Sequence, residues 1–155
     1  MTPANFPEPD TGGDRFSCND ATADALTVAQ LRDEFARWLR RGAGMDETRM
    51  CDTVLAVNEA LANAAEFAYV DNVAGTVDLD AVRDIRRGTI TVTVSDQGHW
   101  RETNSLHRLR SRGRGIALMR TLADSVIIDT SGLGTSVRLR FDAAVARTPA
   151  AGGVC

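Results

Sequence analysis

The chain contains no lysine, and all 18 of its basic residues are arginine. This absence excludes a phosphate-binding loop of the GxxxxGK[ST] type, a lysine Schiff base, and a protein-kinase fold that depends on a strand lysine. If the protein handles nucleotide phosphates, then backbone amides, a metal ion or arginine must contact them. Codon bias in a GC-rich genome would produce the same absence, so the missing lysine limits the chemistry without assigning one.

Cysteine, long apolar runs and net charge are also scarce. The three cysteines are an odd number at wide spacing, which fits neither a disulfide framework nor a CxxC zinc site and indicates a reducing, cytoplasmic location. No apolar run is long enough to span a membrane, and Asp14 and Arg15 stand where a signal peptide would be apolar. A net charge of −3 gives no reason to expect direct binding to nucleic acid.

The composition is that of one globular domain with two loose ends. Residues 1–14 contain three of the four prolines and predict a disordered tail, and residues 143–155 predict a flexible C-terminal tail. With 43% hydrophobic residues, the chain can form one substantial core. We therefore expect residues 15–142 to form a single domain.

Helices are expected first along the chain and strands afterwards. Helical periodicity predicts helices over about 20–41 and 46–68, whereas alternation begins beyond Gly75. Strands are expected at 76–82, 89–96, 125–129 and 135–141, with a short helix at about 115–123. The residues expected to be buried are Val28, Leu31, Phe35, Trp38 and Leu39 in the first helix and Val54, Leu55, Leu61, Ala62 and Ala65 in the second. This order predicts an α+β fold, a two-layer sandwich with a mixed, mostly antiparallel sheet and helices on one face.

The second helix carries a carboxylate and a carboxamide one turn apart, Glu59 and Asn63, among small alanines. An exposed polar pair on an alanine-rich helix is one interpretation. The functional alternative is a nucleotide site, because an asparagine oxygen is a suitable ligand for Mg²⁺. A glutamate beside it could accept a proton from a hydroxyl or water that attacks a γ-phosphate.

Of three glycine-containing motifs, the first two are each open to two interpretations. In "SDQGHW", Asp96 and Gly98 fit a simple turn, or a carboxylate that accepts a hydrogen bond from an exocyclic amine of a flat ligand. In "RGRGIALM", Gly113 and Gly115 would open a helix, which suits either a hinge or the binding of phosphate at free N–H groups. The third motif, around Thr135, is by itself a hairpin turn.

The stretch between Trp100 and Gly113 is polar, lacks periodicity and is too long for a tight turn. Together with the residue that follows Gly113, it contains five arginines and one acid, Glu102. We expect a functional or mobile loop with a local positive charge.

The order of these signals resembles the Bergerat ATP-binding fold of gyrase-type ATPases, heat-shock chaperones and sensor histidine kinases (the GHKL superfamily). The segments "NEALANAAEFAY" and "RGRGIALMRTLADSV" resemble most the anti-sigma-factor serine/threonine kinases, over about residues 20–141. The resemblance implies ATP and Mg²⁺ as cofactors. It assigns roles to the following positions: Glu59 as catalytic base, Asn63 as Mg²⁺ ligand, Asp96 with Gly98 as the reader of the adenine amino group, Gly113 and Gly115 with Arg112, Arg114 and Ile116 at the phosphates, Thr135 near adenine, and 101–112 as a mobile lid.

The implied function is a kinase that phosphorylates an anti-anti-sigma protein of the STAS type, sequesters a sigma factor and works as a homodimer. A sensor histidine kinase is less suitable, because no phosphoacceptor histidine lies on a dimerisation helix. Trp100 replaces the second glycine of the usual D-x-G-x-G box. This departure favours an alternative, a catalytically weak nucleotide-binding module that acts by partner switching. A plain ATPase subunit akin to the gyrase group would normally carry a second domain.

Overall fold

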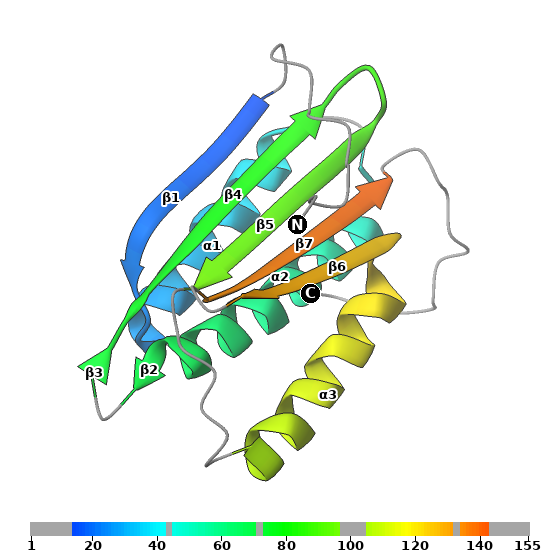
Figure 1. The fold of residues 1–155 in the computed structure, drawn as a ribbon. Helices are drawn as coiled ribbons and strands as arrows, with labels where there is room; N and C mark the ends of the chain where they lie inside the picture. Colours follow the sequence, from blue (N-terminus) through cyan, green and yellow to red (C-terminus); the bar gives the residue numbers. More distant parts are fainter. Residues whose placement is uncertain (1–13, 43–44, 71–72, 97–104, 132–133, 143–155) are drawn as a thin grey trace.

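The structure is a computed structural model that describes residues 14–42, 45–70, 73–96, 105–131 and 134–142 (Figure 1). Its elements are β1 (Asp14–Thr22), α1 (Ala25–Arg41), α2 (Glu47–Ala68), β2 (Tyr69–Val70), β3 (Val73–Ala74), β4 (Thr76–Asp84), β5 (Thr89–Asp96), α3 (Ser105–Leu122), β6 (Ser125–Ser131) and β7 (Gly134–Asp142). Both predicted tails lie outside the described residues, apart from Asp14, which begins a strand. None of the described helices is both long and apolar enough to cross a membrane.

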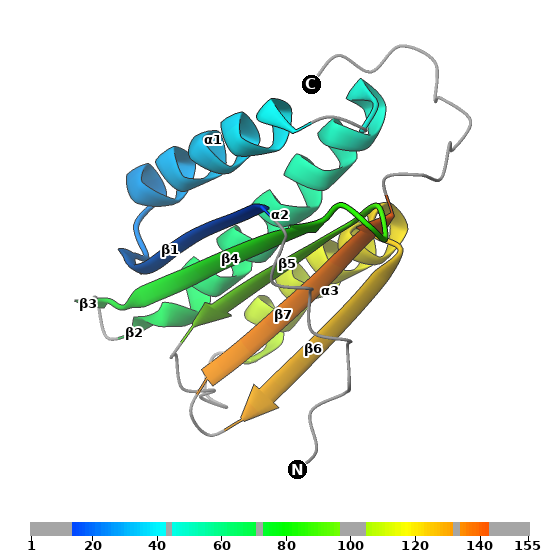
Figure 2. The same ribbon diagram turned by 90° about the horizontal axis from the view of Figure 1, so that it is seen from above.

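A five-stranded sheet in the order β1-β4-β5-β7-β6 forms one layer of the molecule. The three helices lie together on one face of this sheet, and β2 and β3 form a separate short hairpin (Figures 1 and 2). This arrangement confirms the predicted α+β sandwich. Every strand pair among the described residues is antiparallel, so the expected mixture with parallel pairs is not found there.

Helix α1 confirms its predicted apolar stripe, since all five expected residues are buried. The helix begins later than predicted because Asp24 is its N-cap, with a carboxylate that accepts hydrogen bonds from the Thr27 backbone N–H at 2.8 Å and the Thr27 hydroxyl at 2.9 Å. It ends at Gly42, the predicted stop.

Helix α2 begins after its predicted cap, because the Asp46 carboxylate accepts a hydrogen bond from the Arg49 N–H at 2.7 Å. The predicted buried face is wrong in part: Leu55 and Ala62 are exposed. The observed buried face consists of Thr53, Ala56, Val57, Ala60, Leu61 and Ala64. Because α2 is apolar around much of its circumference, periodicity alone could not identify the face that packs on the sheet.

The edge strand β1 was not predicted. Its alternation is interrupted by a bulge between Cys18 and Ala21, where Asp20 has a positive φ of 58°. In contrast, the β4–β5 hairpin confirms the predicted strands and the role of Gly88, which has a φ of 64°.

The region that was predicted to be a loop and lid at 101–112 is helical from Ser105 onward. Leucine and arginine are good helix formers, which supports a helix in "SLHRLRSR". Its polar and apolar residues are not segregated to faces, so a search for periodicity does not detect it. The remaining predicted lid residues, 101–104, lie outside the described part of the chain.

The cysteines differ in state. Cys51 on α2 is disulfide-bonded, and Cys18 on β1 is a free thiol. The expectation of a chain without disulfides, drawn from cysteine number and spacing, is therefore wrong for Cys51.

Candidate functional site

Glu59 and Asn63 lie where α2 meets the backbone of α3. A Cβ atom built on Gly115 would lie 3.0 Å from Asn63 Nδ2 and 3.2 Å from Glu59 Oε2. The two polar side chains are half-buried, and they share this contact as their spacing of one turn predicts. The pair therefore borders a neighbouring helix, in disagreement with the interpretation of a polar pair on an open surface.

A small cavity beside this contact brings together Asn63, Asp96, Ile116 and Thr135. These four predicted site residues come from α2, β5, α3 and β7, which are far apart in the sequence. The other cavity walls are formed by Ala60, Ala64, Val94, Met119, Ile128 and Val137. With a volume of about 10 Å³, the cavity has room for about one water molecule in this conformation, and it would have to open to admit a flat organic ligand.

Asp96 occupies an inward position at the end of β5. The three preceding inward residues of that strand, Ile90, Val92 and Val94, are buried and apolar, whereas Asp96 is a carboxylate only 6% exposed. Its neighbour across the ladder is Thr135, which is 7% exposed. Burying a carboxylate is costly unless hydrogen-bond donors reach it, so an aspartate at this inward position is unusual for a strand end that only packs against the core.

The start of β7 is shaped by Gly134, whose φ of 140° lies in the region that favours glycine. This residue and Thr135 are both buried. The predicted glycine–threonine turn therefore places Thr135 in the wall of the cavity.

One predicted mechanism of phosphate binding is wrong in this conformation. Gly113 and Gly115 lie inside α3, because the helix begins at Ser105. Their N–H groups are within the helix and do not form its free first turn. Gly115 has a steric role instead, since it allows the backbone of α3 to approach Glu59 and Asn63.

The other predicted phosphate contacts are only partly observable. Arg114 is exposed on α3. The side chain of Arg112 is not among the described ones, and Gly98 lies outside the described residues. Their assignments therefore stay predictions.

The donor set beside Gly115 fits Mg²⁺ better than a transition metal. The described residues contain no group of three or more histidine, cysteine, aspartate or glutamate side chains that could hold a metal ion. Asn63 and Glu59 offer oxygen donors at this point, and Mg²⁺ typically takes one or two protein oxygens together with waters and phosphates.

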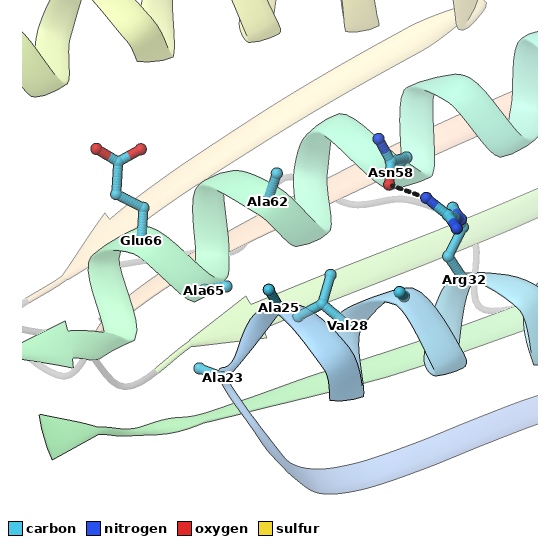
Figure 3. A pocket seen from close by; sticks show the side chains of 9 residues that line it. Ala23, Ala25, Val28, Arg32, Asn58, Ala62, Ala65 and Glu66 are labelled. Atoms are coloured by element: carbon cyan, nitrogen blue, oxygen red, sulfur yellow. Dashed lines mark hydrogen bonds between the residues drawn. The ribbon is translucent and has the colours of Figure 1, made fainter.

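A larger hollow of about 490 Å³ lies elsewhere, between α1 and α2 (Figure 3). Alanines and Val28 form most of its walls, and Arg32 donates a hydrogen bond to Asn58 at 3.4 Å at one end. None of the predicted site residues lines it. Four of the predicted site residues line the smaller cavity instead.

Residues 21–141 match the family described as the histidine kinase-like ATPase domain. The chain belongs to this family. The match covers most of the domain predicted at 15–142 and includes every residue of the cavity. Membership confirms the resemblance that the ordered motifs indicated, and it implies that the domain binds ATP.

Two solved structures are similar to this ATPase-family domain. One contains the RsbU and RsbW domains of Rv1364c from Mycobacterium tuberculosis, with a TM-score of 0.65, 22% identity, and coverage of 83% of this chain and 32% of that chain. The other is the histidine kinase domain of a blue-light activated histidine kinase from Erythrobacter litoralis EL346, with a TM-score of 0.49, 18% identity, and coverage of 77% and 60%. The chain spans about a third of the length of the first structure. That likeness bears on the fold alone, and the second is too distant to carry an argument.

Some residues of the cavity were not predicted. Met119 and Ile128 line the cavity, although only their places on an expected helix and strand were identified. Met119 lies one helical turn after Gly115, so its position on the same face of α3 was the available signal.

Proposed function

We propose that this chain is an ATP-dependent serine/threonine protein kinase that acts as an anti-sigma regulatory factor. The observation that carries the proposal is the contact of Glu59 and Asn63 with Gly115, beside a cavity that contains Asp96 and Thr135. The first group suits phosphate and metal chemistry, and the second suits recognition of a base. The RsbW domain in the similar Mycobacterium tuberculosis structure supports the regulatory part of the proposal.

The residues divide into binding and reacting groups. Asp96 accepts a hydrogen bond from the adenine amine, and Thr135 completes that end of the cavity. Gly98, Arg112 and Arg114 are proposed to contact the phosphates, by the resemblance of their motifs. Ile116 supplies an apolar wall.

Glu59 is the proposed general base. Its carboxylate takes the proton of a serine or threonine hydroxyl while the hydroxyl oxygen forms a bond to the γ-phosphorus of ATP. The bond from that phosphorus to the bridging oxygen breaks, and ADP leaves with the electron pair. Mg²⁺ held by Asn63 would neutralise negative charge on the phosphates.

The proposed acceptor is a STAS-type anti-anti-sigma protein, and the proposed second partner is a sigma factor. A cytoplasmic location belongs to the same proposal, because a sigma factor acts inside the cell. The proposal also includes a homodimer, which the resemblance to anti-sigma-factor kinases implies. Light scattering of the purified chain tests the dimer directly: a mass near twice that of the 16.7 kDa chain supports it, and a mass near 16.7 kDa contradicts it.

Transfer of labelled phosphate from ATP to STAS-domain proteins of the same genome tests the kinase. Wild type should transfer, and Glu59→Gln should bind Mg²⁺-ATP but lose about 100-fold or more in rate, in the range of general-base effects. Asn63→Ala should lose Mg²⁺-dependent binding. Transfer at the wild-type rate by Glu59→Gln would contradict the role given to Glu59.

A second candidate function is a nucleotide-binding module that switches partners without turnover. Trp100, which lies outside the described residues, favours it because it replaces a glycine of the first glycine box. Under this alternative, wild type binds Mg²⁺-ATP but transfers no phosphate. Trp100→Gly would then be expected to gain measurable transfer.

A further inference from the structure

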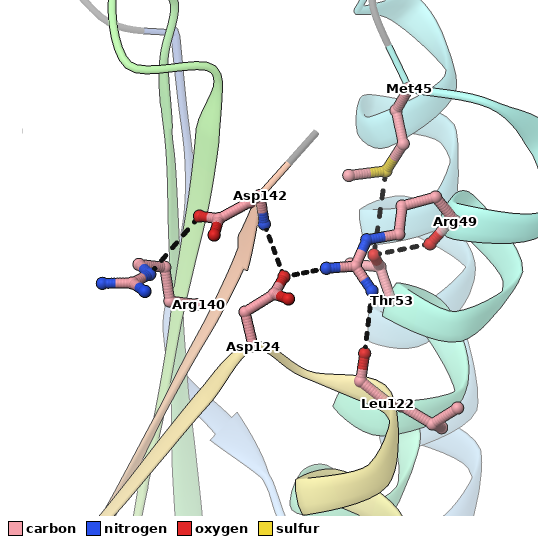
Figure 4. Close-up of polar contacts among 7 residues, drawn as sticks. All are labelled: Met45, Arg49, Thr53, Leu122, Asp124, Arg140 and Asp142. Atoms are coloured by element: carbon pink, nitrogen blue, oxygen red, sulfur yellow. Dashed lines mark hydrogen bonds and ion pairs between the residues drawn. The ribbon is translucent and has the colours of Figure 1, made fainter. Parts of the chain in front are cut away.

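Helices α2 and α3 meet at a second place, far from the candidate site, through Arg49 (Figure 4). The side chain of Arg49 is 3% exposed. It donates a hydrogen bond to the Leu122 carbonyl at 3.0 Å and forms a hydrogen-bonded ion pair with the Asp124 carboxylate. Its guanidinium lies 5.6 Å from the centre of the Phe141 ring, within cation–π distance.

Asp124 ties the end of α3 to the sheet as well. Its carboxylate accepts a hydrogen bond from the Asp142 N–H at 2.8 Å, and its own N–H donates to the Arg140 carbonyl at 2.9 Å. On the other side, the Arg49 carbonyl accepts a hydrogen bond from the Thr53 hydroxyl at 2.8 Å (Figure 4). We call the Arg49 and Asp124 pair, with its bond to the Leu122 carbonyl, the arginine clamp.

The arginine clamp and the Gly115 contact together define how α3 is aligned along α2. Arg49, near the start of α2, meets the last turn of α3, whereas Glu59 and Asn63 further along α2 meet Gly115 earlier in α3. The two helices are therefore antiparallel. The contacts are separated by about 15 Å along α2, from Arg49 to Glu59, at roughly 1.5 Å per residue.

Alignment matters because a side chain at position 115 would displace Glu59 and Asn63 from the positions they occupy opposite glycine. Even a methyl group at position 115 would lie 3.0 Å from Asn63 Nδ2. A screw displacement of α3 by one residue would bring Arg114 or Ile116 to that place, and either side chain would displace Glu59 and Asn63. A device that fixes the alignment is thus needed for the geometry of the candidate site.

We propose that the arginine clamp is this device, and that Arg49 and Asp124 are positioning residues that hold Gly115 opposite Glu59 and Asn63. The buried fork of the guanidinium fixes distance and direction together, which a single hydrogen bond or an apolar contact does not. The effect of the clamp on ATP affinity rests on the proposed function, whereas its effect on the alignment of α3 does not.

The chain contains a matched control for this proposal at the end of α1. Arg83 lies 4.4 Å from the Trp38 ring centre and donates to the Leu39 carbonyl at 3.1 Å and the Trp38 carbonyl at 3.4 Å. It also pairs with Asp14 at 2.7 Å. Arg83 thus resembles Arg49 in its aromatic partner, helix-end carbonyls and carboxylate, but it fixes α1 and has no part in the alignment of α3.

The direct test is an NMR comparison of full-length wild type, Arg49→Met and Arg83→Met without nucleotide, well below their unfolding temperatures. Methionine keeps the apolar stem and removes the guanidinium. Arg49→Met is expected to shift or broaden the signals of the Gly115 N–H and the Asn63 side-chain amide, whereas Arg83→Met is expected to leave both as in wild type. Unchanged signals in Arg49→Met, or equal changes in both variants, would overturn the proposal.

Two milder variants keep the test decisive if Arg49→Met does not fold. Arg49→Lys keeps the charge but lacks the planar fork, and Asp124→Asn keeps an acceptor but lacks the charge. Both should shift or broaden the same two signals relative to wild type. Wild-type signals in both of these variants would also overturn the proposal.

The consequence for nucleotide is measured by calorimetry with Mg²⁺-ATP. If loss of the clamp leaves the competent alignment populated at one tenth, the dissociation constant rises about tenfold, and Arg83→Met should stay within about twofold of wild type. An affinity loss shared by both variants at matched unfolding temperatures would contradict a positioning role. If wild type binds no Mg²⁺-ATP, the proposed function fails, and the NMR comparison still decides whether the clamp sets the alignment.

Discussion

Replacing Gly115 with alanine should separate the stability of the fold from nucleotide binding. The added methyl group would lie 3.0 Å from Asn63 Nδ2, 3.2 Å from Glu59 Oε2 and 3.5 Å from Asn63 Oδ1. These atoms are the ends of side chains, so they can move by a few tenths of an ångström without displacing backbone. The variant is therefore expected to fold.

Two opposing effects set its stability. Alanine gains about 1 kcal/mol over glycine inside a helix. Displacing Glu59 and Asn63 from their preferred rotamers costs about 0.5–1.5 kcal/mol. The net change should stay within about 1 kcal/mol, which is a shift of the unfolding temperature by no more than about 4 °C in a chain of this size.

Nucleotide binding should fall much more than stability. The methyl group occupies the space between α3 and the two polar side chains, and it therefore displaces the proposed Mg²⁺ ligand Asn63. Loss of one interaction with a charged group costs about 1.5–3 kcal/mol, so we expect Mg²⁺-ATP affinity to fall roughly ten- to 100-fold by calorimetry, while circular dichroism records the unfolding temperature.

Ala117→Gly is the matched control, because Ala117 is exposed on the same helix. It should lose about 1 kcal/mol of stability and keep wild-type affinity. Wild-type affinity in Gly115→Ala would refute the argument from close approach. A fall in unfolding temperature beyond about 10 °C in that variant would show that the Glu59 and Asn63 side chains cannot move to make room for the methyl group.

Three further predictions concern α1 and β1. Hydrogen bonds from the Thr27 backbone and side chain lower the pKa of the Asp24 carboxyl, so its stabilising effect is present above the unfolded pKa near 4 and is lost as pH falls through the folded pKa. The free energy of unfolding, measured in urea at stepwise lower pH, should therefore fall more steeply in wild type than in Asp24→Asn, and parallel curves would contradict this. Burial raises the pKa of the Cys18 thiol, with Glu34 and Asp78 adding to the effect, so iodoacetamide should alkylate Cys18 at pH 8 more slowly in the native than in the unfolded chain. Phe35 is fully buried against other aromatic rings, so Phe35→Ala should cost about 3–5 kcal/mol in denaturant unfolding, and a cost below about 1 kcal/mol would show that the core repacks.

The sequence predicted the parts of the fold that depend on strong local patterns. The stripe that includes Phe35 and Trp38, the cap at Asp46 and the turn at Gly88 are set by periodicity, side-chain capping and positive φ. Strand β1 was not predicted because its bulge at Asp20 interrupts the alternation of inward and outward residues. The early part of α3 was not predicted because its sequence lacks an apolar stripe, although its residues favour a helix.

The candidate site was predictable by residue but not by geometry. Glu59, Asn63, Asp96 and Thr135 were selected from their types and order, and the structure brings the last three to one cavity. Gly115 was selected as well, but for a helix N-terminus that the structure does not have. Its close approach to Asn63 depends on how α3 packs along α2, and that alignment involves Arg49, which no local motif identifies.

The most direct test of the central claim, that this cavity binds ATP through Asp96, is calorimetry with ATP and inosine triphosphate. Inosine triphosphate lacks the amine that Asp96 is proposed to bind. Wild type should bind Mg²⁺-ATP about ten- to 100-fold more tightly than Mg²⁺-inosine triphosphate, as expected for one hydrogen bond to a charged group, and Asp96→Asn should lose most of that preference. Equal affinities in wild type, an unchanged preference in Asp96→Asn, or no binding of either nucleotide would contradict the account.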